Sequence, residues 1–199
     1  MKKTTFRVSS VASRTLLFSM LLCLASFILF GLLLAVFGER FVNYLIMIPF
    51  LSGYLHTNLT HFGLNMLLLF GLLHAASNES YTYKDLFRIT FLISLLYLPV
   101  AIFGITDPAV GISGTVYFLM ARYFLSMNNK QTGILWLSGI LLLELFSHTP
   151  ESRVAYGVHY LGVLVGALSL KRPIFWGFQL RPLCTNNPRN QIDIEKNSY

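Results

Sequence analysis

Charged residues are scarce in this sequence. Only 12% of the 199 residues are Asp, Glu, Lys or Arg, whereas 55% are hydrophobic. A soluble domain carries about 25% charged residues. It also interrupts its apolar stretches with polar positions, so that one face of each element stays in water. The shortage of charge therefore argues against a soluble globular domain and favours a protein that exposes apolar side chains to lipid.

Cysteine is also scarce, and no internal repeat is evident. The two cysteines are Cys23, in the first apolar run, and Cys184, in a polar stretch near the C-terminus. Because they lie in such different surroundings, we do not expect them to pair. Neither belongs to a metal-binding or redox motif. The cysteines therefore indicate no disulfide framework and no thiolate metal site.

The sequence has long apolar runs instead. They continue for about 20 residues, the length of helix that crosses a hydrocarbon core roughly 30 Å thick. They lack the period-two alternation of a membrane β-strand. Helices are the other structure that satisfies its own backbone hydrogen bonds in lipid. We therefore predict an all-α membrane protein, a bundle of six transmembrane helices at about residues 16–37, 54–73, 86–104, 112–127, 132–146 and 154–170.

Polar segments flank these runs at both ends. The first run follows a basic start and resembles a signal peptide, but it exceeds the usual apolar region of about 7–15 residues. Retention as a helix is therefore favoured over cleavage. The predicted organisation is a cytoplasmic N-terminal segment (1–15), a membrane domain (16–172) and a polar cytoplasmic tail (173–199).

The basic residues predict the orientation. With six spans, only Arg40 and Arg153 fall on one side of the membrane. The other side receives Lys2, Lys3, Arg7, Arg14, Lys84, Arg88, Arg122, Lys130, Lys171, Arg172, Arg181, Arg189 and Lys196. The positive-inside rule then predicts a multi-pass protein of the bacterial inner (cell) membrane with both termini in the cytoplasm. The net charge of +7 reflects this topology and contact with membrane lipids, because the charges are too scattered for a nucleic-acid surface.

Polar side chains within a membrane span are costly and are candidate functional residues. The second predicted span carries His56, His61 and Asn65. One helical turn separates His61 from Asn65, which puts them on one face, whereas His56 lies about 140° away from His61. The two histidines do not have the i, i+4 spacing that binds a metal, and we expect no metal and no cofactor. The alternative for His56 and His61 is a polar role at the membrane interface.

The fourth predicted span opens with Gly111, Ile112, Ser113 and Gly114, and Tyr117 follows one turn later. Ser113 would lie in the first turn of a short helix, where unpaired N–H groups and the helix dipole favour a developing anion. The glycines permit a tight turn and the close approach of a neighbouring helix. The alternative is a patch of small residues that serves packing alone.

The sixth predicted span carries His159, Gly162 and Gly166 on one helical stripe. A Gly-x-x-x-Gly stripe allows a partner helix to approach closely. For an isolated membrane histidine, an interhelical hydrogen bond would be the preferred interpretation.

The predicted topology links the three clusters. Spans two, four and six all begin on the external side, so that His61, Ser113 and His159 lie within about two turns of the outer surface. Serine and histidine supply a nucleophile and the base that activates it. His61, Asn65 and the Ser113 N–H can donate hydrogen bonds to an oxyanion. No acidic third member is evident, which suggests a Ser–His dyad whose base is oriented by packing, against Tyr117.

The three motifs resemble those of the rhomboid intramembrane serine proteases, a family with six core helices. The resemblance covers residues 16–172. It rests on Gly111, Ser113 and Gly114 with Tyr117, on His56, His61 and Asn65, and on His159, Gly162 and Gly166. It implies that Ser113 is the nucleophile and His159 the base, that His61 and Asn65 serve the oxyanion, and that His56 supports them. One departure is plain: the family's Trp-Arg pair is missing, because Glu39 precedes Arg40.

The expected activity is that of an intramembrane serine endopeptidase, a hydrolase that cleaves transmembrane protein substrates near the external membrane face. A catalytically silent rhomboid-like protein that binds membrane clients is the alternative, but it has no chemical need for Ser113 or His159. A transporter or channel would need charged residues along a path through the bilayer. Only Glu144 is a clear candidate for a buried charge, and we expect it to be structural or to line a gate.

Overall fold

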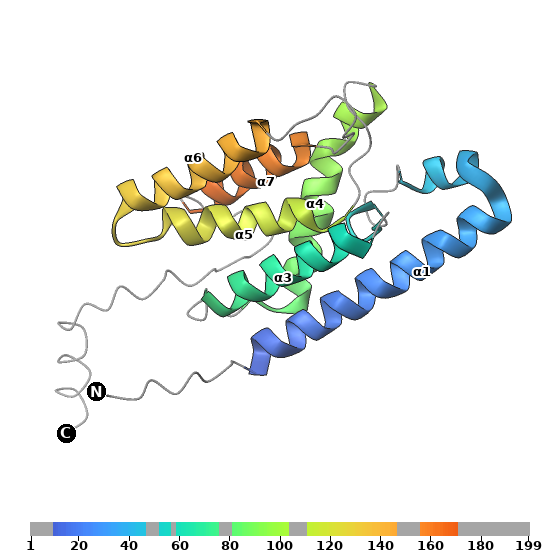
Figure 1. Ribbon diagram of the computed structural model, residues 1–199, viewed down its shortest axis with the longest axis horizontal. Coiled ribbons are helices and arrows are strands. Elements are labelled where there is room, and N and C mark those ends of the chain that lie inside the picture. The colour runs from blue at the N-terminus through green and yellow to red at the C-terminus, as the bar shows by residue number, and fades with distance from the viewer. Residues whose placement is uncertain are drawn as a thin grey trace.

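The computed structural model describes residues 10–46, 52–56, 59–75, 81–103, 111–146 and 156–170. Within these ranges the fold is all-α and contains six helices (Figure 1). They are α1 (Ser10–Ile46), α3 (Leu59–Ala75), α4 (Tyr83–Ile102), α5 (Ser113–Leu125), α6 (Lys130–Phe146) and α7 (Tyr156–Ser169). The all-α class is confirmed, and each predicted span overlaps one helix. The predicted tail at 173–199, with Cys184, lies outside the described residues.

The helices differ in how well they could cross a membrane. In the described part of the chain, one helical stretch, Val11–Gly38, is long and apolar enough to do so, and it lies near the N-terminus. A membrane anchor and a signal sequence share this character. Leu59–Ala75 and Tyr156–Ser169 are apolar but shorter. Six membrane crossings therefore stay a prediction. The first stretch ends at Gly38, whose φ of 76° interrupts α1.

Local side-chain bonds explain where two of the helices begin. Thr82 directly precedes α4, and Asp85 lies in its first turn. Asp85 accepts a hydrogen bond from the Thr82 backbone N–H (2.9 Å), and the Asp85 N–H donates to the Thr82 hydroxyl (3.4 Å). These reciprocal bonds form a capping box. Before α6, the Asn129 side chain accepts a hydrogen bond from the Thr132 N–H (3.2 Å), as an N-cap does.

Helix α5 is the centre of the fold. It packs against α3, α4, α6 and α7, and nine of its thirteen residues are buried. Its most extensive contact is with α7, where two glycines allow a close approach. A Cβ atom at Gly162 would overlap the carbonyl oxygen of Gly114, and one at Gly166 would lie 2.6 Å from the carbonyl oxygen of Phe118. The glycine stripe therefore lets the two backbones touch.

A buried polar network joins four segments at the C-terminal end of α5. Arg122 donates hydrogen bonds to the hydroxyl groups of Tyr81 and Ser169, both at 2.7 Å. The Thr15 hydroxyl of α1 donates to the backbone carbonyl of Tyr81 (2.9 Å). This network ties α1, α5 and α7 together at the end of α5 opposite to Ser113.

Candidate functional site

Three helices bring their first turns to the candidate site. His61 lies near the start of α3, Ser113 is the first residue of α5, and His159 lies in the first turn of α7. Helix α6, which contacts α5, contributes Glu144 from its last turn. The chain therefore assembles four polar side chains from four helices that are distant in sequence.

The turn before Ser113 requires a glycine. Gly111 has a φ of 106°, in the left-handed region that favours glycine. Its N–H donates a hydrogen bond to the carbonyl oxygen of Ser52 (2.8 Å). A Cβ atom at Gly111 would lie only 3.2 Å from His56 Nε2 and from His61 Cε1. Gly111 thus fixes the start of α5 against both histidines, and Ser113 follows two residues later, 3% exposed.

His56 and Asn65 form one hydrogen-bonded pair beside this turn. The fully buried His56 ring uses Nδ1 to donate to the carbonyl oxygen of Tyr54 (3.0 Å). Its Nε2 is then the acceptor for the Asn65 amide nitrogen at 3.3 Å. The sequence analysis put His56 on the second helix. This is wrong, because α3 begins only at Leu59 and His56 precedes it in a non-helical segment. The pair nevertheless forms, and it holds the Asn65 side chain in place.

His159 is held by an aromatic stack. Its imidazole lies parallel to the Tyr117 ring, with a centroid separation of 4.3 Å and an interplanar angle of 5°. Tyr117 comes one turn after Ser113 on α5. One turn after His159, Gly162 packs on the carbonyl oxygen of Gly114. The same close helix contact therefore aligns the serine, the tyrosine and the histidine.

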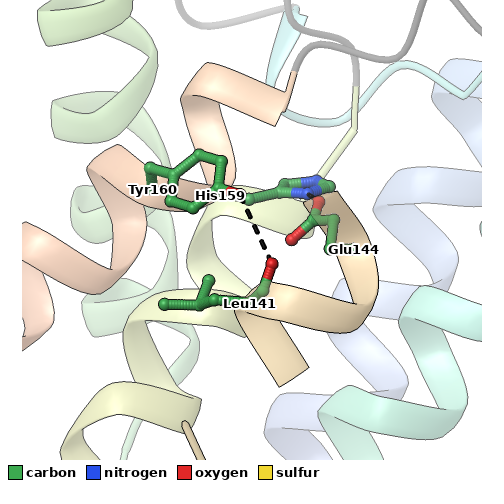
Figure 2. A network of polar contacts seen from close by, with 4 residues as sticks. All are labelled: Leu141, Glu144, His159 and Tyr160. Carbon is green, nitrogen blue, oxygen red and sulfur yellow. Dashed lines mark hydrogen bonds and ion pairs between the residues drawn. The ribbon is translucent and has the colours of Figure 1, made fainter. Parts of the chain in front are cut away.

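Glu144, which the sequence suggested to be structural or to line a gate, lies at the candidate site. Its Oε1 is hydrogen-bonded to His159 Nδ1, and Figure 2 shows the carboxylate at the edge of the imidazole. Tyr117 also lies near this carboxylate. In the sequence, Glu144 is conspicuous as a lone carboxylate in an apolar run. The sequence does not indicate which residue this carboxylate contacts. Both carboxylate and imidazole are almost completely buried.

The two halves of the site meet between His61 and His159. These imidazoles are close enough to interact electrostatically, and the His61 and His56 rings lie 5.4 Å apart. The recorded contacts of Ser113 and His159 do not include a hydrogen bond between the two. Their link is the helical turn from Ser113 to Tyr117 and the ring stack on His159. Catalytic hydrogen bonds are commonly long before substrate binds.

In comparisons with known proteins, no protein-family model and no curated protein sequence matches this chain. What can be said of the site therefore rests on its own residues. Within the described residues, no group of three or more His, Cys, Asp or Glu side chains could hold a metal ion. The cluster does contain a buried hydroxyl at a helix N-terminus, an imidazole paired with a carboxylate, and amide and imidazole donors beside them. Groups of these kinds can supply a nucleophile, its base and oxyanion donors.

Proposed function

We propose that this chain is an intramembrane serine endopeptidase, similar to the rhomboid proteases, with Ser113 as nucleophile and His159 as base. The observation that carries the proposal is the arrangement of α5 and α7. Ser113 begins α5, Tyr117 follows one turn later, and the Tyr117 ring stacks on His159 at 4.3 Å. A packing patch of small residues would need the glycines, but it would need neither the serine nor the histidine.

The chemistry follows the usual acyl-transfer route. Ser113 Oγ attacks the carbonyl carbon of the scissile peptide bond as its proton passes to the imidazole of His159. The imidazolium then gives this proton to the leaving amine, and the C–N bond breaks to form an acyl-enzyme. Water attacks the acyl group, His159 takes the proton of the water, and Ser113 leaves with a proton returned from the imidazolium.

Three donors could stabilise the oxyanion of the tetrahedral intermediate. The Ser113 N–H lies in the first turn of α5, where no intrahelical carbonyl is available to it. His61 lies against Gly111, two residues before the nucleophile. Asn65 is oriented by its hydrogen bond to His56. One amide proton of Asn65 is engaged with His56, so that the second proton is the one available to substrate.

We further propose a multi-pass membrane protein with both termini in the cytoplasm. The orientation is supported by the basic residues, most of which fall on one side of the predicted spans. The membrane location is supported by the described helices, which expose many large apolar side chains and bury several polar ones. Large apolar side chains face outward on α1, α3, α6 and α7; they include Val36, Leu67, Leu135, Trp136, Leu143 and Leu164. The buried side chains include Thr15, Asn65, Thr90, Ser113, Thr115, Arg122, Glu144 and His159. Water would penalise so much exposed apolar surface, whereas lipid accepts it.

The outer surface also indicates the substrate class. The helix ends around the candidate site carry exposed apolar side chains, such as Leu59, Phe103 and Phe146, which favours the approach of a peptide from the lipid. Transmembrane protein segments that unwind near the external face are therefore the proposed substrates.

The proposal is tested by a cleavage assay on a single-span membrane substrate in detergent or liposomes. The wild-type protein should cut the substrate near the external end of its span, and Ser113→Ala should not. Ser126→Ala is the matched control, because Ser126 caps the opposite end of the same helix. A folded wild-type protein that cuts none of a panel of such substrates would favour the silent client-binding protein.

A further inference from the structure

Glu144 lies in surroundings that disfavour a carboxylate. Within the described part of the chain it is the only buried acidic side chain, and Leu142, Leu143 and Leu145 surround it in sequence. A charge in an apolar helix is costly unless it is paired. The pair that forms is with His159, the proposed base, from the neighbouring helix α7. The carboxylate therefore acts on the one residue whose protonation the proposed chemistry uses.

The contact is made to a specific nitrogen of the ring. Glu144 Oε1 meets Nδ1, and one flat face of the imidazole is covered by Tyr117. A carboxylate on Nδ1 keeps the proton on that nitrogen, which leaves Nε2 with a free electron pair. Nε2 is then the nitrogen that can take a proton from a serine hydroxyl. This is the division of roles found in serine–histidine–acid triads.

We propose that Glu144 is a positioning residue that turns the Ser113–His159 dyad into a Ser–His–Glu arrangement. This inference rests on the proposed function. Glu144 holds His159 in the tautomer with Nδ1 protonated, and it stabilises the imidazolium that forms when the Ser113 proton moves to Nε2. The Tyr117 ring, stacked on the face of the imidazole, keeps the edge that carries Nδ1 turned toward the carboxylate.

The test compares Glu144→Gln and Glu144→Asp with wild type by the rate at which a fluorophosphonate probe labels Ser113. Glu144→Gln keeps the size of the side chain but can present an N–H to Nδ1, which stabilises the wrong tautomer. Its maximal labelling rate should fall, by up to the loss of about 10⁴-fold that follows when the acid of a triad is replaced by its amide. The probe concentration for half-maximal rate should stay unchanged. Glu144→Asp should restore part of the rate.

Tyr160→Phe is the matched control for helix packing. The Tyr160 hydroxyl donates a hydrogen bond to the carbonyl oxygen of Leu141 (3.4 Å), and so joins the same two helices at an exposed position (Figure 2). Its removal should leave the labelling rate at the wild-type value. A loss of rate as large as that in Glu144→Gln would reduce Glu144 to a helix-packing contact and overturn the inference.

Two outcomes separate this inference from the proposed function. If wild type labels on Ser113 and Glu144→Gln labels equally fast, the positioning role is wrong and the dyad stands alone. If wild type does not label at all, the proposed function itself fails. Nitrogen NMR of the wild-type protein gives a test that needs no variant. A neutral His159 should carry its proton on Nδ1, and a proton on Nε2 would overturn the inference.

Discussion

At the scale of single residues, the environment of Asn65 illustrates how the site divides its work. Asn65 is 4% exposed, and its amide donates to His56, which in turn donates to a backbone carbonyl. This chain of bonds fixes the amide before substrate binds, so that binding costs little further side-chain entropy of Asn65. His61 is placed differently, by contact with Gly111 and with the His56 ring. Both side chains are thus positioned beside His56, Asn65 by a hydrogen bond and His61 by a ring contact.

We predict that Asn65→Ala and His61→Ala each lower kcat for substrate cleavage by about 10²-fold, because loss of one oxyanion donor commonly has this effect. Partial activity should remain, since the Ser113 N–H is unchanged. His74→Ala is the control, because His74 lies at the opposite end of the same helix. Wild-type rates in both site variants would mean that α3 has only a structural role.

Residue identities alone indicated much of the candidate site but not all of it. The motifs singled out Ser113, His159, His61 and Asn65, since polar residues in apolar runs are conspicuous. Glu144 was noticed in the same way, yet its role was missed. Its partner lies fifteen positions along the chain on another helix, and only the packing of α6 and α7 against α5 brings the two together. Spacing within one helix carries no such information.

At the scale of helices, the apolar runs predicted six helices because each run is apolar over about the length of helix that crosses a bilayer. The boundaries were less accurate. The second helix begins at Leu59, not near residue 54, and Asn58, a residue type that is common at N-caps, directly precedes it in the sequence. This signal would have placed His56 before the helix.

The contact between α5 and α7 makes a prediction about Gly162. A Cβ atom there would overlap the Gly114 carbonyl oxygen, so that Gly162→Ala must push the helices apart. We expect Gly162→Ala to destabilise the fold by about 1–3 kcal/mol and to lower the cleavage rate, because His159 would move relative to Tyr117. Thermal unfolding in detergent and the cleavage assay measure the two effects.

Gly139→Ala provides the comparison, because a Cβ atom at Gly139 meets nothing within 4 Å. It should be neutral or slightly stabilising, as alanine favours a helix. If Gly162→Ala behaved in the same way, the close approach of α5 and α7 would not be needed for the site.

At the scale of the whole molecule, cleavage near the external membrane face requires that the candidate site lies on that side. Thirteen of the fifteen basic residues were assigned to the opposite side from the sequence. A reporter fused after Arg172 should therefore read as cytoplasmic, and one inserted after Pro150, between α6 and α7, as external. A tail that reads as external would contradict the six-span arrangement and, with it, the orientation of the site.

The central claim is that Ser113 is made reactive by His159, and probe labelling of the purified protein tests it most directly. A serine hydroxyl has little nucleophilicity at neutral pH unless a base takes its proton. A fluorophosphonate probe should therefore label the wild-type protein on Ser113 alone. Labelling should vanish in Ser113→Ala, fall sharply in His159→Ala and stay unchanged in Ser126→Ala. A folded wild-type protein that stays unlabelled, or equal labelling of His159→Ala, would contradict the account.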